Sequence, residues 1–261
     1  MAWPYLKPKA IDFIKNHRDS LCVMVDSGAF TFSKKGQRPT IQSYADFIRS
    51  LPFEPFKYFT LDEIGNPEYS FRNYEGLLKL GLNPVPIFTR GANIKDLNRY
   101  YETADVVGIG GLVKTPRNKG FVKGIMPYIA GRKTHWLGFC SSDFVHHYKP
   151  FSCDSTTWNV SAMCASMYLY IGGGRIMQIK KADFSKKLDP KVAEYIRNLG
   201  FEPTLFHKNS TWQGNPSLTQ RIGAKSAVMM SRWLEKNYGT KMFLACGSEG
   251  DLQTIIKEYE S

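Results

Sequence analysis

The sequence lacks a hydrophobic run long enough to cross a membrane. A membrane-spanning helix needs about 18 or more mostly apolar residues, and no run in the 261 residues approaches that length. The first twenty residues mix charges and prolines with apolar side chains, unlike a secretory signal peptide. We therefore expect a soluble, cytoplasmic protein that does not bind membranes.

Cysteine is scarce, and its spacing does not suggest cross-links or metal sites. The five cysteines are an odd number, widely spaced and without a C-x-x-C pair: Cys22, Cys140, Cys153, Cys164 and Cys246. This pattern argues against a disulfide framework and a zinc ribbon, and is typical of a reducing compartment. His146 and His147 lie near Asp143, but adjacent histidines are poorly spaced as metal ligands, so no metal is expected.

Acidic side chains are outnumbered by basic ones. The 35 Lys and Arg residues against 23 Asp and Glu residues give a formal charge of +12. Such an excess favours a polyanionic partner, nucleic acid first of all, although it could also serve solubility alone. With 43% hydrophobic residues the chain can bury a full core, which excludes intrinsic disorder.

Short apolar runs alternate with segments of helical periodicity through the first half of the chain. Strands are predicted at 21–25, 58–61, 85–88, 106–109, 135–139 and 151–153, and helices at 41–51, 70–80 and 94–103. Strands that are apolar on both faces suit a parallel sheet covered by helices. The alternation and a length near 250 residues predict an α/β fold, namely a (β/α)8 TIM barrel, with a doubly wound open sheet as the alternative.

The second half is less regular. Strands are predicted at 175–179, 203–206 and 242–245, which makes nine candidates for eight places, so one of them must be something else. Helices are predicted at 190–199, with Asp189 as N-cap, and at 217–238, ending at Gly239. Without a repeat or linker, we expect one domain over residues 1–261, in which 159–261 complete the barrel.

Polar residues follow the predicted strands. They are Asp26-Ser27-Gly28, Asp62-Glu63, Thr89-Arg90-Gly91, the run 108–112, Gly138, and Asp154-Ser155. In a parallel barrel these positions line one mouth, where catalysis occurs. We therefore expect Asp26, Asp62 and Asp154 to converge on one rim, although an aspartate at a strand end can also be only a helix cap.

The glycine clusters do not indicate a nucleotide cofactor. Gly108 to Lys114 departs from the dinucleotide fingerprint, and the triplet 172–174 lacks the ending of a phosphate loop. The triplet predicts a tight turn. We expect no redox or nucleotide cofactor.

The motifs at these strand ends resemble the tRNA-guanine transglycosylase family, and in particular its DpdA-type relatives, the DNA deazaguanine transglycosylases of phages and bacterial modification clusters. The resemblance lies in Val-Asp-Ser-Gly-Ala-Phe at 25–30, Leu-Asp-Glu at 61–63, Gly-Ile-Gly-Gly-Leu at 108–112, His-Trp-Leu-Gly-Phe at 135–139 and Ser-Cys-Asp-Ser at 152–155, in the family's order. It spans residues 21–158 and implies a TIM barrel. If the gene is phage-encoded, the protein works in the host cytoplasm.

The resemblance implies a role for each matched residue. Asp154 is the nucleophile and Asp26 the general acid/base, while Asp62 reads the guanine edge. Ser27 contacts the base, Phe30 stacks on it, and the backbone of Gly110, Gly111 and Leu112 forms a wall against it. The implied partners are DNA, with its guanosine flipped out or single-stranded, and a free 7-deazaguanine base; a homodimer is compatible with the sequence.

Several positions depart from the family pattern. Residues 155–261 offer only Cys164 and Cys246, so the zinc-binding subdomain of the tRNA enzymes is not expected. Thr31 and Arg90 stand where those enzymes have glutamines. Arg90 is expected to contact the 7-substituent or a phosphate, or else to pair with Glu63. The missing zinc-binding subdomain and the short chain favour DNA over tRNA.

Basic stretches near the motifs supply candidate phosphate contacts. They comprise Lys34, Lys35 and Arg38 after the first motif and Lys114, Arg117 and Lys119 after the glycine run. Further basic residues lie at 180–187 and on the helix at 217–238, which is first expected to be a packing helix with a solvated face. Four functions are carried forward: DNA-guanine exchange, tRNA-guanine exchange, a non-catalytic nucleic-acid-binding barrel, and a barrel enzyme acting on a small sugar.

Overall fold

The computed structural model describes residues 1–112, 118–159, 165–185, 188–212 and 217–261. The chain divides into two compact units, Met1–Phe139 and Cys140–Ser261, each of which is described by itself. It is a mixed α/β protein in which parallel strands alternate with helices, as the sequence predicts. That it forms one domain, closed as a barrel, stays a prediction.

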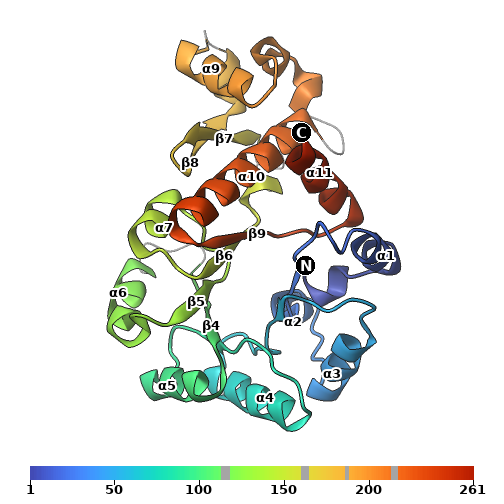
Figure 1. Ribbon diagram of the computed structural model, residues 1–261, viewed down its shortest axis with the longest axis vertical. Helices are drawn as coiled ribbons and strands as arrows, with labels where there is room; N and C mark the ends of the chain where they lie inside the picture. Colours follow the sequence, from blue (N-terminus) through green and yellow to red (C-terminus); the bar gives the residue numbers. More distant parts are fainter. Residues whose placement is uncertain (113–117, 160–164, 186–187, 213–216) are drawn as a thin grey trace. The chain divides into compact units, whose positions relative to one another are not determined.

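The first unit follows a strand–helix alternation (Figure 1). Its elements in chain order are η1 (Trp3–Tyr5), α1 (Pro8–Asn16), β1 (Met24–Val25), α2 (Ala29–Lys34), α3 (Ile41–Ser50), β2 (Lys57–Tyr58), α4 (Pro67–Lys79), β3 (Ile87–Phe88), α5 (Ile94–Thr103), β4 (Val106–Ile109), α6 (Asn118–Ile129) and β5 (Lys133–Trp136).

The strands of this unit are neighbours in the order in which they occur in the chain. β1 pairs with β2, a bridge between Phe59 and Val85 joins β2 to β3, β3 pairs with β4, and β4 pairs with β5, all in parallel. The first residues of the chain add a further parallel bridge, from Ala2 to Asp26. This N-terminal addition is not evident from the local sequence pattern.

One ring contact shows that these strands curve. Ile87, Gly108 and His135 are in register and share a face, and Phe59 is on that face because it pairs with Val85, two residues from Ile87. In a flat sheet β2 and β5 would be about 14 Å apart. The ring centroids of Phe59 and His135 are nevertheless 4.9 Å apart, so the sheet is curled around this face.

Gly108 lies on this concave face with little space around it. A Cβ atom added there would be 2.9 Å from Cδ1 of Leu137, 3.2 Å from the Pro86 carbonyl oxygen and 3.4 Å from Ile87. A side chain at position 108 would therefore require its neighbours on this face to shift.

Local sequence signals explain where the helices begin. Thr40 and Ser43 form a reciprocal capping box at α3, and the side chains of Asn66 and Asn93 accept backbone N–H bonds at the starts of α4 and α5. The predicted helix at 94–103 is confirmed at both ends, and the one at 41–51 is confirmed to within one residue. Strand β4 also has its predicted bounds, 106–109.

The second unit combines a parallel strand pair with an antiparallel hairpin. Its elements are α7 (Ser142–Tyr148), β6 (Ser152–Ser155), β7 (Ser166–Gly172), β8 (Arg175–Lys180), η2 (Lys181–Ser185), α9 (Pro190–Asn198), η3 (Pro203–His207), η4 (Asn209–Trp212), α10 (Leu218–Tyr238), β9 (Lys241–Leu244) and α11 (Glu249–Glu260). β6 pairs in parallel with β9, and β7 pairs with β8.

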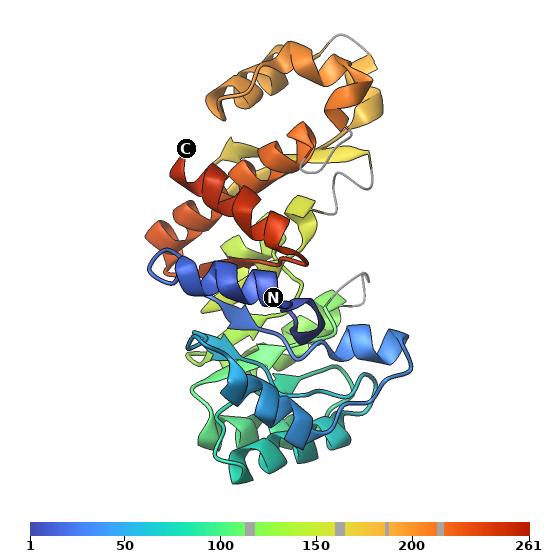
Figure 2. The ribbon, with the colours of Figure 1, turned by 90° about the vertical axis from the view of Figure 1, so that its right-hand side faces the viewer.

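The long helix α10 organises this unit. It packs across the hairpin β7–β8 and against α11, which is beside it in both ribbon views (Figures 1 and 2). Buried apolar residues of the hairpin, α9, η3 and α10 form one core, which includes Met167, Leu169, Ile196, Phe206 and Ile222. The helix predicted at 217–238 is α10, and its predicted end at Gly239, a left-handed C-cap, is confirmed. The predicted N-cap of α9, Asp189, is also confirmed.

Two predictions for this half need correction. Residues 203–206 are not a strand but the 3₁₀ helix η3, because Pro203 lacks an N–H for a sheet and the Glu202 side chain caps Thr204. The strand predicted at 175–179 is β8, which pairs antiparallel with β7, so two of the nine candidates lie outside the parallel strands. Strand β7 was missed, and it turns into β8 through Gly172, Gly173 and Gly174, which all have positive φ angles, so the predicted tight turn is confirmed.

In the part of the chain that the structure describes, no helix combines the length and the apolar character that a membrane span requires.

Neighbouring glycines of the hairpin turn provide a test of this packing. Gly173 and Gly174 have φ values of +58° and +67°, but a Cβ atom would meet nothing within 4 Å at Gly173, whereas at Gly174 it would be 2.3 Å from the Trp233 ring. Gly173→Ala should cost about 1–2 kcal/mol of unfolding free energy through backbone strain alone. Gly174→Ala should cost about 1–3 kcal/mol more through overpacking. Urea unfolding of the two variants measures the difference, and equal losses would contradict the contact with Trp233.

Candidate active site

The carboxyl ends of β1 to β4 bring the predicted site residues of the first unit to one edge. Because the strands are parallel and consecutive, the residues that follow them emerge at the same end. Asp26 follows β1, Asp62 follows β2, Arg90 follows β3 and Gly110 follows β4. The topology therefore places these four positions along one rim.

Asp26 is held by a backbone hydrogen bond. Its Oδ1 accepts the N–H of Gly28 at 2.7 Å. Gly28 has a φ of +78°, and a Cβ atom there would be 2.3 Å from Cδ of Pro4. Glycine at position 28 thus allows both the turn that bonds Asp26 and the close approach of the N-terminal segment.

Ser27 joins the two strand ends. Its side chain is fully buried, and its Oγ donates to Oδ1 of Asp62 at 3.2 Å. Asp26 and Asp62 both remain partly exposed. The predicted residues Asp26, Ser27 and Asp62 are thus brought together; the contact of Ser27 is with Asp62, while its predicted contact with a base stays a prediction.

The protonation of Asp62 is shifted by this setting. Burial of the carboxyl group, followed by the nearby charge of Asp26, raises the pKa of Asp62 to about 7, against the opposing effect of the Ser27 hydrogen bond. A carboxyl group with such a pKa exchanges its proton near neutral pH. The pair therefore contains a group able to act as both acid and base.

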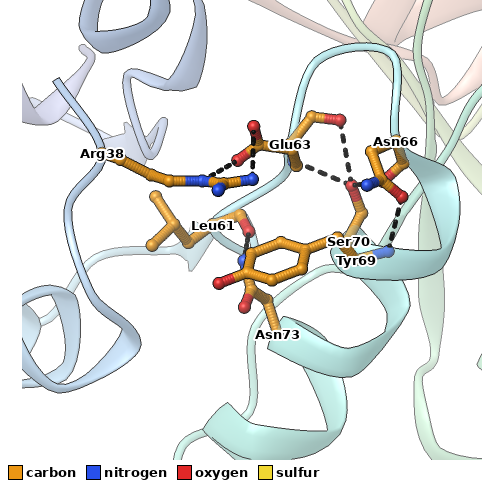
Figure 3. A network of polar contacts seen from close by, with 7 residues as sticks. All are labelled: Arg38, Leu61, Glu63, Asn66, Tyr69, Ser70 and Asn73. Atoms are coloured by element: carbon orange, nitrogen blue, oxygen red, sulfur yellow. Dashed lines mark hydrogen bonds and ion pairs between the residues drawn. The ribbon is translucent and has the colours of Figure 1, made fainter. Parts of the chain in front are cut away.

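Glu63 anchors the loop that carries Asp62 (Figure 3). Arg38 binds both carboxylate oxygens of Glu63, through Nη2 at 2.9 Å and Nε at 3.2 Å. The Glu63 N–H donates to Oγ of Ser70 at 2.8 Å, and Nδ2 of Asn73 donates to the Leu61 carbonyl at 2.7 Å. Helix α4 and Arg38 thus fix the backbone on either side of Asp62.

Arg38 was predicted to contact nucleic acid, and the structure gives it a protein partner. Its guanidinium pairs with Glu63 and also lies over the Tyr69 ring, 4.7 Å from the centroid. Arg90 had been considered as the partner of Glu63. Tyr69 and Ser70 help to position this loop, and the sequence pattern did not predict either of them. The local sequence shows only the N-cap signal of Asn66.

The glycine run after β4 lies beside the loop after β3. A Cβ atom at Gly111, whose φ is +71°, would be 3.8 Å from the backbone nitrogen of Arg90. The N–H of Gly110 donates to the Phe88 carbonyl at 2.9 Å, as part of the sheet. Leu112 is buried. An N–H offered to a ligand at this turn is therefore that of Gly111 rather than that of Gly110.

Phe30 and the lysines after it are at the surface. Phe30 is 61% exposed, and Nζ of Lys34 lies 4.3 Å from its ring centroid. Lys35 is also exposed. Of the other predicted nucleic-acid contacts, Lys114 and Arg117 lie outside the described residues, and Lys119 is described only through the backbone of α6.

Asp154 belongs to the second unit. It lies within β6, in register with Phe243 of β9, and is partly exposed. The preceding residue, Cys153, is buried, with its Sγ 3.1 Å from Sγ of Cys140. Because side chains alternate along a strand, the side chains of Cys153 and Asp154 point to opposite faces of the sheet. The role of Asp154 as nucleophile stays a prediction.

The basic residues of α10 serve helix packing. Arg221 pairs with the buried Glu258 of α11 at 2.7 Å, Lys225 donates to Ser261, and Arg232 donates to the Tyr259 carbonyl. These contacts favour the interpretation of α10 as a packing helix.

No family model matches the chain, and no curated protein shows significant sequence similarity to it. Among the residues that the structure describes, no three histidine, cysteine or acidic side chains gather as a metal site would require.

The raised pKa of Asp62 predicts a pH-dependent stability. The carboxyl holds its proton up to about pH 7 in the folded chain but only to about pH 3.8 when unfolded. Its contribution to stability is thus complete below pH 3.8 and is lost as the pH rises through 7. Asp62→Asn should therefore be as stable as the wild type at pH 4 and more stable at pH 8, by on the order of 2–4 kcal/mol.

The measurement is urea unfolding of both proteins between pH 4 and 8. Asp19→Asn is the matched control, because the Asp19 side chain is 97% exposed, and this variant should follow the wild type at every pH. A constant difference between Asp62→Asn and the wild type would contradict the assignment of the buried titrating group to Asp62.

Proposed function

We propose that this protein is a pentosyltransferase that exchanges guanine in DNA for a 7-deazaguanine base. The observation that carries the proposal is the cluster of Asp26, Ser27 and Asp62 at the strand ends, where one carboxyl group has a pKa near 7 beside a second carboxyl group. Base exchange at an N-glycosidic bond needs such a proton carrier, because the departing base gains a proton and the incoming base loses one.

The proposal includes a TIM barrel without a zinc-binding subdomain. Two observations on the first unit support a barrel over a doubly wound sheet. Its strands run in chain order without the reversal that defines a doubly wound sheet, and the contact between Phe59 and His135 requires strong curvature.

The proposed reaction is a double displacement. A carboxylate of Asp154 attacks C1′ as the bond from C1′ to N9 of guanine breaks, which leaves a deoxyribosyl ester. The N9 atom of the incoming 7-deazaguanine then attacks C1′ and releases Asp154. Two inversions retain the configuration, and the reaction uses neither a redox cofactor nor a nucleotide cofactor.

The remaining predicted residues are proposed to bind the base. The resemblance gives Asp62 the reading of guanine, whose N1–H and 2-amino group lie side by side as donors that a carboxylate can receive together, whereas adenine lacks this donor pair. The Gly111 N–H is the donor proposed for O6. Phe30 is proposed to stack on the base, and Arg90 to contact the 7-substituent or a phosphate. A guanosine in duplex DNA has to be flipped out first, at a cost of a few kcal/mol.

The function is tested by incubating the protein with single- or double-stranded DNA and radiolabelled guanine or 7-deazaguanine. We expect incorporation of label into DNA, and Asp154→Asn should lower it by at least about 10³-fold and abolish the covalent protein–DNA adduct. Asp183→Asn, a change at an aspartate in η2 of the same unit, is the control and should leave incorporation unchanged.

The alternatives give different outcomes of the same assay. Label that enters tRNA but not DNA would show the same chemistry on another substrate. DNA binding without incorporation, unaffected by Asp154→Asn or Asp26→Asn, would overturn the proposal in favour of a non-catalytic binding protein.

The exposed lysines at the end of α2 are proposed to contact phosphates. Replacing both Lys34 and Lys35 by alanine should weaken DNA binding and reduce the slope of log K against log salt by about 1.8 if both contact B-DNA phosphates. Lys7 and Lys9, an exposed pair at the start of α1, serve as the matched control. Fluorescence anisotropy over a range of salt concentrations measures both slopes, and equal slopes would place the phosphate contacts elsewhere.

A further inference from the structure

The two carboxyl groups at the strand ends have hydrogen-bond partners of different chemistry. Oδ1 of Asp26 accepts from the backbone N–H of Gly28 at 2.7 Å. Oδ1 of Asp62 is bonded to the Ser27 hydroxyl at 3.2 Å. A backbone N–H can only donate, whereas a hydroxyl can donate to a carboxylate or accept from a carboxylic acid.

This difference separates the protonation states that each position favours. A donor-only partner at 2.7 Å stabilises the ionised form of Asp26. The Ser27 hydroxyl can rotate, so that it remains bonded to Asp62 whether or not the carboxyl group carries a proton. Ser27 is fully buried, so water does not take its place in this bond.

We infer that Asp62, paired with the reversible hydroxyl of Ser27, is the proton carrier of this site, and that Asp26 is the permanently ionised neighbour. The inference rests on the proposed function and revises the roles that the resemblance implies, which give proton transfer to Asp26 and only base recognition to Asp62.

The charges around Asp62 act in the same direction. The neighbouring carboxylates of Asp26 and Glu63 both disfavour its ionisation, and the charge of Glu63 is compensated by the two bonds from Arg38. Asp26 is therefore the stronger of the two influences. The charge of Asp26 therefore adds to burial, which is the larger cause of the raised pKa of Asp62.

Two buried tyrosines near Asp62, from α3 and α5, add no charge. Tyr44 has a pKa far above its ordinary value, through burial and then the charge of Asp26, and burial likewise raises the pKa of Tyr100. Both phenols therefore stay neutral at physiological pH. The Tyr44 hydroxyl donates to the Phe59 carbonyl at 2.6 Å, so that its proton is committed to the backbone.

In the proposed reaction the proton of Asp62 is conserved over the two steps. As the C1′–N9 bond breaks and the Asp154 ester forms, the Asp62 carboxylic acid gives its proton to a nitrogen of the departing guanine. The resulting Asp62 carboxylate then takes the N9 proton of the incoming base, while N9 bonds to C1′ and the ester bond breaks. Both carboxyl groups return to their starting states.

The inference is tested first without substrate. Carboxyl ¹³C NMR of the full-length protein labelled at aspartate should show one group that titrates near pH 7, and this signal should be absent from Asp62→Asn. Asp26→Asn should lower its midpoint by at least one pH unit, because a like charge is removed. Ser27→Ala should raise the midpoint, because the hydroxyl bonds the carboxylate more strongly than it bonds the carboxylic acid.

Asp26→Asn and Ser27→Ala should thus shift the midpoint of the same titration in opposite directions. A general loss of structure in both variants would not produce opposite shifts. A group near pH 7 that persists in Asp62→Asn and disappears in Asp26→Asn would overturn the inference. Because no base exchange is involved, this outcome is independent of whether the proposed function is correct.

Single-turnover release of labelled guanine from DNA then tests the role in the reaction. The rate of release should fall about tenfold per pH unit above the midpoint of the NMR titration. In Ser27→Ala the pH midpoint of the rate should shift by the same amount as the midpoint of the NMR titration. Asp62→Asn should lower kcat by about 10²–10⁴-fold. If Asp62→Asn instead raises KM and leaves kcat and the pH profile unchanged, Asp62 is a base-recognition residue and the inference is overturned. If the wild type releases no guanine from any DNA, this result counts against the proposed function alone.

Discussion

The burial of one carboxyl group beside a second, at adjacent strand ends, is the constraint on which the first unit's chemistry depends. Asp62 is held next to Asp26 through Ser27, and burial together with the charge of Asp26 raises the pKa of Asp62 to about 7. The loop resists relaxation because Arg38 holds Glu63 and Asn73 holds the Leu61 carbonyl. The fold therefore keeps a proton in place that solvent would otherwise remove at neutral pH.

The parallel and consecutive order of the strands is what makes this juxtaposition possible. Each strand returns its carboxyl end to the same edge, so that short loops far apart in sequence supply Asp26, Asp62, Arg90 and the glycine run. The missing side chain at Gly108 allows Leu137 and Ile87 to approach closely on the concave face of this sheet. Packing on the concave face and the chemistry at the rim thus come from the same strands.

Charge has two different uses in this chain. Arg221 and Arg38 are both bonded to glutamates, and they contribute to packing and loop positioning. Lys34 and Lys35 are exposed and follow the Asp26 motif. The net charge of +12 is therefore a poor guide to any one residue, because it does not distinguish basic side chains with protein partners from those directed to solvent.

The sequence by itself determined the features that arise within a few residues. Helix starts with capping side chains, the glycine turn of the hairpin and the alternation of strands and helices were all predictable, since each depends on local backbone preferences. Only the tertiary structure decided that Ser27 bonds Asp62 and that Arg38 pairs with Glu63. These outcomes depend on which distant segments meet and in which register, and on how far their polar groups are removed from water, which local patterns do not encode.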